Sequence, residues 1–252
     1  MQKEKLAIIV PYRNRKKHLS EFLPYMEQYL KDYDFKIFIV EQANSLPFNR
    51  GRLLNIGFAE AKDNFDYFVF HDVDYIPVDG DYSFNENITH LAGQIEEYGW
   101  KLPYEYFLGG VFMSDKASFL KINGFANEYW GWGEEDNELH DRCVLLKIPV
   151  NRRPGKYRSL AHDRYSHVGL EKENVNYREG LKERMVQETF IDGFTNLTYK
   201  KLGEEKLSAH GVMIKADFEI KREIKTSRLS ILKKDIRFKL GQIKRSLLKK
   251  IK

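Results

Sequence analysis

Continuous apolar runs alternate with runs of helical spacing over the first 80 residues. The runs in "KLAIIVPYRNR", "FKIFIVEQA" and "YFVFHDVDYIP" are short and uninterrupted, which predicts strands buried on both faces. Between them, "HLSEFLPYMEQYLKDY" and "NRGRLLNIGFAEAKD" predict helices, with Pro24 either kinking the first helix or lying in its first turn. This strand, helix, strand, helix, strand order predicts an α/β fold around a parallel sheet, whose ligands bind at the carboxyl ends of the strands.

The pattern is less regular after residue 80. It predicts a helix from about Lys116 to Ile122 and a second over "EEDNELHDRCVLLKI", where Leu139, Cys143 and Leu146 share one stripe. The stretch "GKYRSLAHDRYSHVGLEKENVNYREG" is polar and is predicted to be a mobile loop.

The C-terminal segment differs from the rest of the chain in charge. Residues 221–252 carry thirteen Lys and Arg against two acidic residues, with apolar residues every three or four positions. This basic amphipathic pattern is typical of a helix on an anionic membrane surface, although a helix packed on the body or on a partner chain has the same pattern. Nucleic-acid binding is disfavoured, because Phe238 is the only aromatic residue there. We expect a catalytic domain over 1–215 and a basic tail over 220–252.

Composition limits the cellular setting. The single cysteine, Cys143, permits no internal disulfide and fits a small buried apolar residue. The apolar run near the start is too short for a signal peptide or a membrane span. These features predict a cytosolic protein, or one cut from a longer membrane-anchored form.

Acidic residues follow the third predicted strand, where Asp72 and Asp74 flank Val73. If the strand continues through them, the two carboxylates share a face and can bind Mg²⁺ or Mn²⁺ with a diphosphate. A turn capping the strand is the structural alternative. His162 and His167, in the polar stretch, are candidate imidazole ligands, which suit manganese better than magnesium.

Basic residues occupy other predicted strand ends, in "PYRNR" and "FNRGR". Arg13, Arg15, Arg50 and Arg52 can neutralise phosphates or bind carboxylates there, or can form a solvated surface. Their placement favours a nucleotide site.

Five stretches resemble the β-1,4-galactosyltransferases, in the same order and with similar spacing. They are "IIVPYRNRKKHL", "FNRGRLLNIGF", "FHDVDYIP", "LGGVFMSDKASFLKINGFANEYWGWGEED" and "DGFTNLTY". The resemblance covers roughly residues 5 to 200 and implies a GT-A fold with a Rossmann-like, mostly parallel central sheet. It also implies UDP-galactose as donor, Mn²⁺ as cofactor, a sugar hydroxyl as acceptor and inversion at the anomeric carbon.

The resemblance assigns roles to individual residues. Those on the donor side are Pro11, Tyr12, Arg13, Arg15, Phe48, Arg50, Asp72, Val73, Asp74, Gly110, Trp132 and Glu135. Those on the acceptor side are Tyr104, Phe107, Glu134, Glu135, Asp136 and Asn137. It makes Asp136 the catalytic base and Asp74 a metal ligand, selects His162 over His167 as the second ligand, and places Trp132 on a loop that closes over the donor.

Four positions depart from the vertebrate pattern of this family. Glu134 stands where glycine is common, Asn137 replaces an acid, Ser159 replaces a methionine and Glu97 replaces a basic residue. An N-acetylglucosamine acceptor therefore does not follow from the resemblance. Phe107 is a bulky aromatic at the position that selects galactose, while "EEDNE" also resembles an element of N-acetylgalactosaminyltransferases of the polypeptide and chondroitin types.

These observations predict a bacterial-type, peripheral-membrane galactosyltransferase that extends a glycan or a lipid-linked saccharide. We expect it in the cytoplasm at the inner face of a membrane, with no nucleic-acid partner, in surface polysaccharide or glycolipid synthesis. The alternatives are an N-acetylgalactosaminyltransferase of the chondroitin-like type and a non-catalytic carbohydrate-binding protein.

Overall fold

The computed structural model describes residues 4–161, 170–185 and 192–219 and contains two sheets within them. The larger sheet consists of β1 (Lys5–Tyr12), β2 (Asp34–Gln42), β3 (Tyr67–His71), β5 (Ile88–His90), β7 (Val111–Asp115), β8 (Val150–Arg152), β10 (Lys200–Lys206) and β11 (Gly211–Asp217). Their order across the sheet is β10-β11-β2-β1-β3-β7-β5-β8. The smaller sheet has the order β4 (Tyr75–Pro77), β9 (Lys156–Ser159), β6 (Gln94–Ile95).

The centre of the larger sheet is parallel. β2 and β3 both pair in parallel with β1, and β11 extends this half by pairing in parallel with β2. On the other side β7 runs antiparallel to β3 and to β5, while β10 closes the opposite edge as an antiparallel hairpin with β11. The sheet is therefore mixed, with a Rossmann-like parallel half, as predicted.

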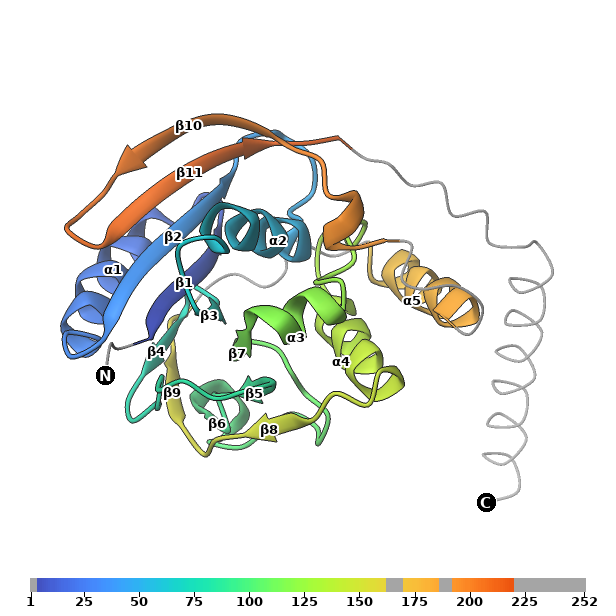
Figure 1. The fold of residues 1–252 in the computed structure, drawn as a ribbon, viewed down its shortest axis with the longest axis horizontal. Helices are drawn as coiled ribbons and strands as arrows, with labels where there is room; N and C mark the ends of the chain where they lie inside the picture. The colour runs from blue at the N-terminus through green and yellow to red at the C-terminus, as the bar shows by residue number, and fades with distance from the viewer. Residues whose placement is uncertain (1–3, 162–169, 186–191, 220–252) are drawn as a thin grey trace, which may run out of the picture.

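Helices cover both faces of this sheet (Figure 1). The helices are α1 (Lys16–Tyr29), α2 (Arg50–Ala61), α3 (Lys116–Lys121), α4 (Glu135–Leu145) and α5 (Glu171–Met185), with short 3-10 turns η1 (Glu96–Tyr98) and η3 (Phe194–Asn196). α1 and the smaller sheet pack on one face, and α2, α3 and α4 pack on the other.

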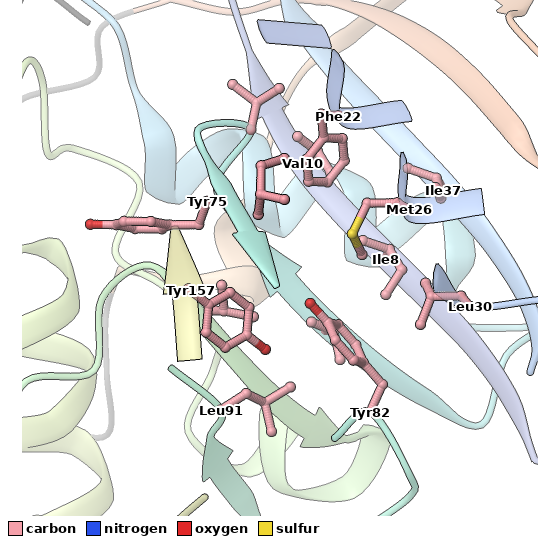
Figure 2. Packing of buried hydrophobic residues seen from close by; sticks show 14 of the residues in the cluster. Ile8, Val10, Phe22, Met26, Leu30, Ile37, Tyr75, Tyr82, Leu91 and Tyr157 are labelled. Atoms are coloured by element: carbon pink, nitrogen blue, oxygen red, sulfur yellow. The ribbon is translucent and has the colours of Figure 1, made fainter. Parts of the chain in front are cut away.

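Two apolar clusters hold these layers together. Along β1, Leu6, Ile8 and Val10 face one cluster while Ala7 and Ile9 face the other, because side chains alternate along a strand. Figure 2 shows the first cluster, in which side chains of β1, β2 and α1 meet three tyrosines and one leucine from the region of the smaller sheet, Tyr75, Tyr82, Tyr157 and Leu91. Both faces are buried, which explains the uninterrupted apolar run of the strand.

The second cluster brings α2 very close to β1. A Cβ on Gly57 would lie 2.3 Å from Cγ2 of Ile9 and 3.0 Å from Cγ2 of Val40, so this helical position has no room for a larger side chain. The contact packs the middle of α2 directly on β1 and β2.

Three local predictions require correction or refinement. The third strand stops at His71 and resumes as β4, because Asp72 and its neighbours form a turn. The polar stretch predicted as a mobile loop contains β9 and α5; buried Tyr177 and Leu181 give α5 its apolar side. Pro24 lies inside α1, beyond its first turn.

The described residues include the end expected for the catalytic domain but not the expected tail. β11 extends past residue 215, where we expected the catalytic domain to end, and the tail over 220–252 lies outside the described residues. No helix in the described part of the chain is long and apolar enough to cross a membrane.

Candidate active site

The carboxyl ends of the parallel strands and the start of two helices meet at one edge of the sheet. Arg13 follows β1 and Asp72 follows β3, while Arg50 begins α2. Glu135 and Asp136 begin α4. This is the edge at which open α/β sheets bind their ligands.

Arg50 is at the centre of this cluster. Its Nε donates to Oδ1 of Asp72 at 2.7 Å, and one terminal nitrogen lies 3.7 Å from Oε1 of Glu135. Burial opposes its charge, but the two carboxylates raise its pKa. Both terminal guanidinium nitrogens are buried without a hydrogen-bond partner among the described residues. Buried donors of this kind are rare in folded proteins and favour an anionic ligand.

The two carboxyl groups beside Arg50 are unusually basic. Burial has the largest effect on Glu135, and the neighbouring Asp136 carboxylate has the next largest. Together they raise the pKa of Glu135 to about 7, although the positive charge of Arg50 opposes the rise. Burial also raises the pKa of Asp136, while Arg50 and the Asn137 amide lower it. Oδ1 of Asp136 accepts from that amide at 2.8 Å, and the other oxygen lies only 2.5 Å from where a Cβ on Gly109 would stand. Gly109 therefore leaves room for the carboxylate.

Asp72, Val73 and Asp74 form the turn between β3 and β4. The expectation that a continuous strand places both carboxylates on one face is wrong, because Tyr75 N bonds back to Asp72 O at 3.3 Å and Asp72 N bonds to Gly110 O at 3.0 Å. The turn lets Asp72 reach Arg50. Val73 is buried, and the Asp74 carbonyl accepts from Leu160 N at 2.7 Å.

The expected nucleotide-side residues lie beside this turn. Pro11 and Tyr12 end β1 and are buried. Arg13 donates to Leu46 O, and its guanidinium carbon lies 5.4 Å from the centre of the Phe48 ring. Arg15 stands apart from this contact, at the N-cap of α1.

The expected acceptor-side residues form a second group. Tyr104 donates its hydroxyl to Oδ1 of Asn137 at 2.9 Å, and its ring meets that of Phe107 edge-on at 5.4 Å. Phe107 also packs against His90 and Tyr98. These contacts form an aromatic wall beside the start of α4.

The two tryptophans before α4 have different surroundings. Trp130 is buried and donates its indole N–H to Glu128 at 3.0 Å, whereas the Trp132 side chain is 64% exposed. Gly110 has φ +79°, and a Cβ there would lie 2.7 Å from the Tyr75 ring. Gly110 therefore lies beside the turn, where its carbonyl accepts from Asp72 N, while Trp132 is exposed to solvent.

The metal site is tested only in part. Asp74 lies in the turn beside Asp72, and the backbone partner of its carbonyl, Leu160, precedes His162 by two positions in the sequence. His162 itself lies outside the described residues. Within those residues, no group of three or more His, Cys, Asp or Glu side chains is arranged to hold a metal ion.

Comparison with known proteins follows the same regions of sequence. A family model described as the N-terminal region of glycosyl transferase group 7 matches residues 1–85, and one described as the N-terminal domain of galactosyltransferase matches residues 89–167. Mouse β-1,4-galactosyltransferase 1 is 38% identical over 211 residues, which cover 80% of this chain and 52% of the relative. The human protein of that name is 36% identical over 211 residues, covering 80% of this chain and 52% of the relative.

The fold agrees with these matches. A solved Drosophila β-1,4-galactosyltransferase 7, in complex with manganese, UDP-Gal and xylobiose, superposes with a TM-score of 0.73 at 27% identity, covering 86% of this chain and 95% of that one. The chain belongs to the β-1,4-galactosyltransferase family. It spans about half the length of the curated relatives it matches. The predicted GT-A fold is confirmed.

Relative to the family pattern, the four departures have specific surroundings. Glu134 has φ +77° and forms an ion pair with Arg178 at 2.6 Å, and it shares that carboxylate with Asn137 at 3.5 Å. Ser159 donates its amide to Glu96 at 3.1 Å, and Glu97 accepts from the Tyr75 hydroxyl. Each departure therefore has a partner within this chain.

Sequence reasoning missed two supports of the site. His71 is buried, its Nδ1 lies 2.9 Å from Asp72 O, and its Nε2 lies 2.8 Å from the Tyr82 hydroxyl. Burial lowers the pKa of His71 to about 4, so the ring is neutral and braces the turn. The second missed support is Gly109, which leaves room for the Asp136 carboxylate. Its position directly before Gly110 was the available signal, because paired glycines let other groups approach the backbone closely.

Proposed function

We propose that this chain transfers galactose from UDP-galactose to a hydroxyl of an acceptor sugar, with inversion at the anomeric carbon. The observation that carries the proposal is the partly buried cluster of Arg50, Asp72, Glu135 and Asp136 at the ligand-binding edge of the sheet. It contains guanidinium donors without hydrogen-bond partners among the described residues, beside a carboxylate whose pKa is raised. The Arg50 guanidinium can bind an anion, and the Asp136 carboxylate can accept a proton.

The nucleotide diphosphate lies against the part of the site that contains Arg13, Arg50 and Asp72. The terminal nitrogens of Arg50 donate to its anionic oxygens or to the sugar, and the uridine lies near Pro11, Tyr12 and Arg13. Arg13 is already braced against Phe48 and Leu46, so little side-chain entropy is lost when the nucleotide binds.

Manganese fits the donor set available to this chain. The Asp74 carboxylate and the His162 imidazole would hold it, because an oxygen and a neutral imidazole suit Mn²⁺. When bound, the ion supplies positive charge that stabilises the leaving diphosphate. The chain's own cation for the same purpose is Arg50.

Asp136 acts as the general base. As the acceptor oxygen forms its bond to the anomeric carbon, the bond from that carbon to the UDP oxygen breaks on the opposite face. The hydroxyl proton passes to the Asp136 carboxylate, and the electron pair of the broken bond leaves with UDP. A raised pKa suits this role, because a base with a pKa nearer to neutrality accepts a proton more readily.

The acceptor lies against the aromatic wall of Tyr104 and Phe107. These rings supply flat apolar surfaces for a sugar, while Asn137 and Glu135 supply hydrogen-bonding groups at the start of α4. The bulk of Phe107 favours galactose over N-acetylgalactosamine as the transferred sugar. The acceptor class is a glycan or a lipid-linked saccharide.

Release of UDP from UDP-galactose in the presence of Mn²⁺ and a panel of sugar acceptors tests the proposal. We expect product only when donor, metal and a suitable acceptor are all present. The mass of the product should exceed that of the acceptor by one hexose residue. A protein that binds glycans in calorimetry without UDP or metal, and never releases UDP, would instead be a carbohydrate-binding protein that has lost turnover.

We further propose that residues 220–252 bind an anionic membrane surface and hold the enzyme at the cytoplasmic face of a membrane. The support is the sequence pattern of basic residues between apolar ones. Sedimentation with vesicles containing phosphatidylserine tests this. Replacing Lys233, Lys234 and Lys239 with Gln should weaken binding by roughly a hundredfold, at about 1 kcal/mol per charge, and unchanged binding would contradict the proposal.

A further inference from the structure

Helix α5 lies beside α4 and contacts the backbone that leads into it (Figure 1). This helix belongs to a region that the sequence pattern did not identify as structured. None of the roles assigned so far uses its residues. Its side chains nevertheless hydrogen-bond to five of the residues between 130 and 137, namely Trp130, Trp132, Gly133, Glu134 and Asn137.

The backbone before α4 is strained. Gly131 has φ +78°, Gly133 has φ +98° and Glu134 has φ +77°. Glycine tolerates this left-handed region, but a residue with a Cβ such as Glu134 does so only when its surroundings hold it there. This segment, residues 130–134, leads directly into Glu135 and Asp136. Its conformation therefore sets where both carboxylates point.

Asn174 of α5 binds the first part of this segment, residues 130–133. It is fully buried, and its amide nitrogen donates to the carbonyl oxygens of Trp130 at 2.9 Å, Trp132 at 3.1 Å and Gly133 at 3.2 Å. These carbonyls belong to the irregular segment that precedes α4. One side chain thus links three carbonyl oxygens of that segment to α5.

Arg178, one helical turn later, binds the second part. It donates to Glu134 at 2.6 Å and, through two nitrogens, to both carboxylate oxygens of Asp141 at 2.7 and 3.0 Å. Its side chain is 16% exposed, and the bonded carboxylates raise its pKa against the effect of burial. A forked contact of this kind fixes orientation as well as distance. It joins the strained residue to the second turn of α4.

The helix that carries these two residues is itself anchored. Tyr177 donates to the buried carboxylate of Asp192, and its ring meets that of Tyr129 edge-on at 4.9 Å. Leu181 packs in the same cluster, with Ala126. α5 is therefore a fixed support, and Asn174 and Arg178 project from it at positions i and i+4 onto one segment.

We propose that Asn174 and Arg178 are positioning residues that hold Glu135 and Asp136 in their catalytic orientation by clamping the strained backbone from 130 to 134. This inference rests on the proposed galactosyl transfer. Glu134, where the family commonly has glycine, makes the clamp necessary here, because its left-handed conformation is paired with the guanidinium of Arg178. Neither residue contacts the cluster of Arg50 and Asp72.

Arg178→Gln and Asn174→Ala test the clamp, with Lys182→Gln as the matched control. Lys182 lies one turn after Arg178 on α5 and pairs with the same Asp141 at 3.1 Å, but it makes no bond to residues 130–137. We expect each of the first two variants to lower kcat about tenfold, because small misplacements of catalytic groups have effects of this order. The KM for UDP-galactose should change less than twofold, and Lys182→Gln should retain wild-type kcat.

A second arm places Arg178→Gln in a Glu134→Gly background. Glycine adopts the left-handed conformation without support, so we expect Arg178→Gln to lower kcat no more than about twofold further in that background. An equal loss in both backgrounds would overturn the clamp, as would wild-type kcat in both Arg178→Gln and Asn174→Ala.

Hydrogen exchange of the peptide spanning 130–137 provides a readout that needs no activity. It should accelerate in Arg178→Gln and Asn174→Ala, and stay at the wild-type rate in Lys182→Gln; no acceleration would overturn the inference. If wild-type protein transfers no galactose but the exchange result holds, the clamp stands and the proposed function fails. If Arg178→Gln unfolds globally, Arg178→Lys is measured in its place, and it should show a smaller change of the same sign.

Discussion

The two halves of the active site are built in different ways. The half that contains Arg13, Arg50 and Asp72 comes from the ends of adjacent parallel strands and the start of the helix that packs on them. The half that contains Glu135 and Asp136 comes from one irregular segment held by side chains distant in the sequence. The first is positioned by backbone ladders, and the second by individual hydrogen bonds.

This difference shows in how α4 itself is held. Arg142 is fully buried and pairs with Glu138 at 2.7 Å, while its other nitrogens donate to carbonyls of Ile122, Gly124 and Asp192. In the sheet, many backbone hydrogen bonds together hold each strand end in place, so replacing one side chain removes little of this support. The α4 half depends on a few side chains, so we expect its variants to lose activity more sharply.

The largest effect should come from the base. Asp136→Asn keeps the shape of the side chain but removes the acceptor of the proton, so kcat should fall by about a thousandfold. UDP release under saturating donor and acceptor measures this. Circular dichroism should stay at the wild-type signal, and a variant with near wild-type turnover would remove Asp136 from the mechanism.

Two arginines of α2 sharpen the contrast within one helix. Arg50→Gln removes donors that await an anion, so kcat/KM for UDP-galactose should fall by about a hundredfold. Arg52 instead pairs with buried Glu128 and lies over the rings of Trp130 and Phe218 at 5.4 and 5.0 Å. Steady-state kinetics with varied donor measure the loss in Arg50→Gln.

Arg52→Gln is the matched control, measured by denaturant unfolding. We expect it to lower the free energy of unfolding by about 3 kcal/mol, as the loss of one partner of a buried pair does, with the KM for donor unchanged. Equal kinetic defects in the two variants would mean that α2 supports the site only as a whole.

Phe107→Leu tests the aromatic wall at the start of the α4 half. Shortening this side chain opens space among His90, Tyr98 and Tyr104, so the ratio of kcat/KM for UDP-N-acetylgalactosamine to that for UDP-galactose should rise about tenfold. Competition between the two donors, with products separated by mass, measures it. An unchanged ratio would place donor selection elsewhere.

The smallest effect concerns stability and pH. The folded-state pKa of Glu135 is about 7, above its ordinary value, so the group favours folding below about pH 4.5 and this contribution is lost as the pH rises through 7. Glu135→Gln removes the loss. We expect its Tm to exceed that of wild type by roughly 4 °C at pH 8 and to match it at about pH 4. Thermal unfolding without ligand checks this, and a constant difference across the range would contradict it.

The sequence pattern predicted the first half better than the second, for a physical reason. Buried parallel strands and a helix that covers them repeat apolar residues at fixed periods, so β1, α1, β2 and α2 were predicted within a few residues. The sequence left a turn at Asp72 only as an alternative to a continuous strand, because its bonds, to Gly110 and Tyr75, involve backbone groups that have no periodicity. α5 was missed because its outer side is polar and its contacts are with single residues.

Site residues divide in the same way. The contacts among Arg50, Asp72 and Glu135, and between Tyr104 and Asn137, bring together residues that the family resemblance had assigned to one site. Asn174 and Arg178 carry no motif, and only an i, i+4 spacing of polar residues marked them. Their partners are backbone carbonyls and a residue where this chain departs from its family.

One feature of the sheet bears on how the protein is made. β11, at residues 211–217, lies directly against β2, at residues 34–42, so the open edge of β2 is covered only after nearly all of the described chain has been synthesised. Until then the ribosome-bound chain presents a bare hydrogen-bonding edge, of the kind that recruits other strands. A nascent chain of this architecture therefore has a long interval in which chaperones must keep that edge from pairing with a neighbour.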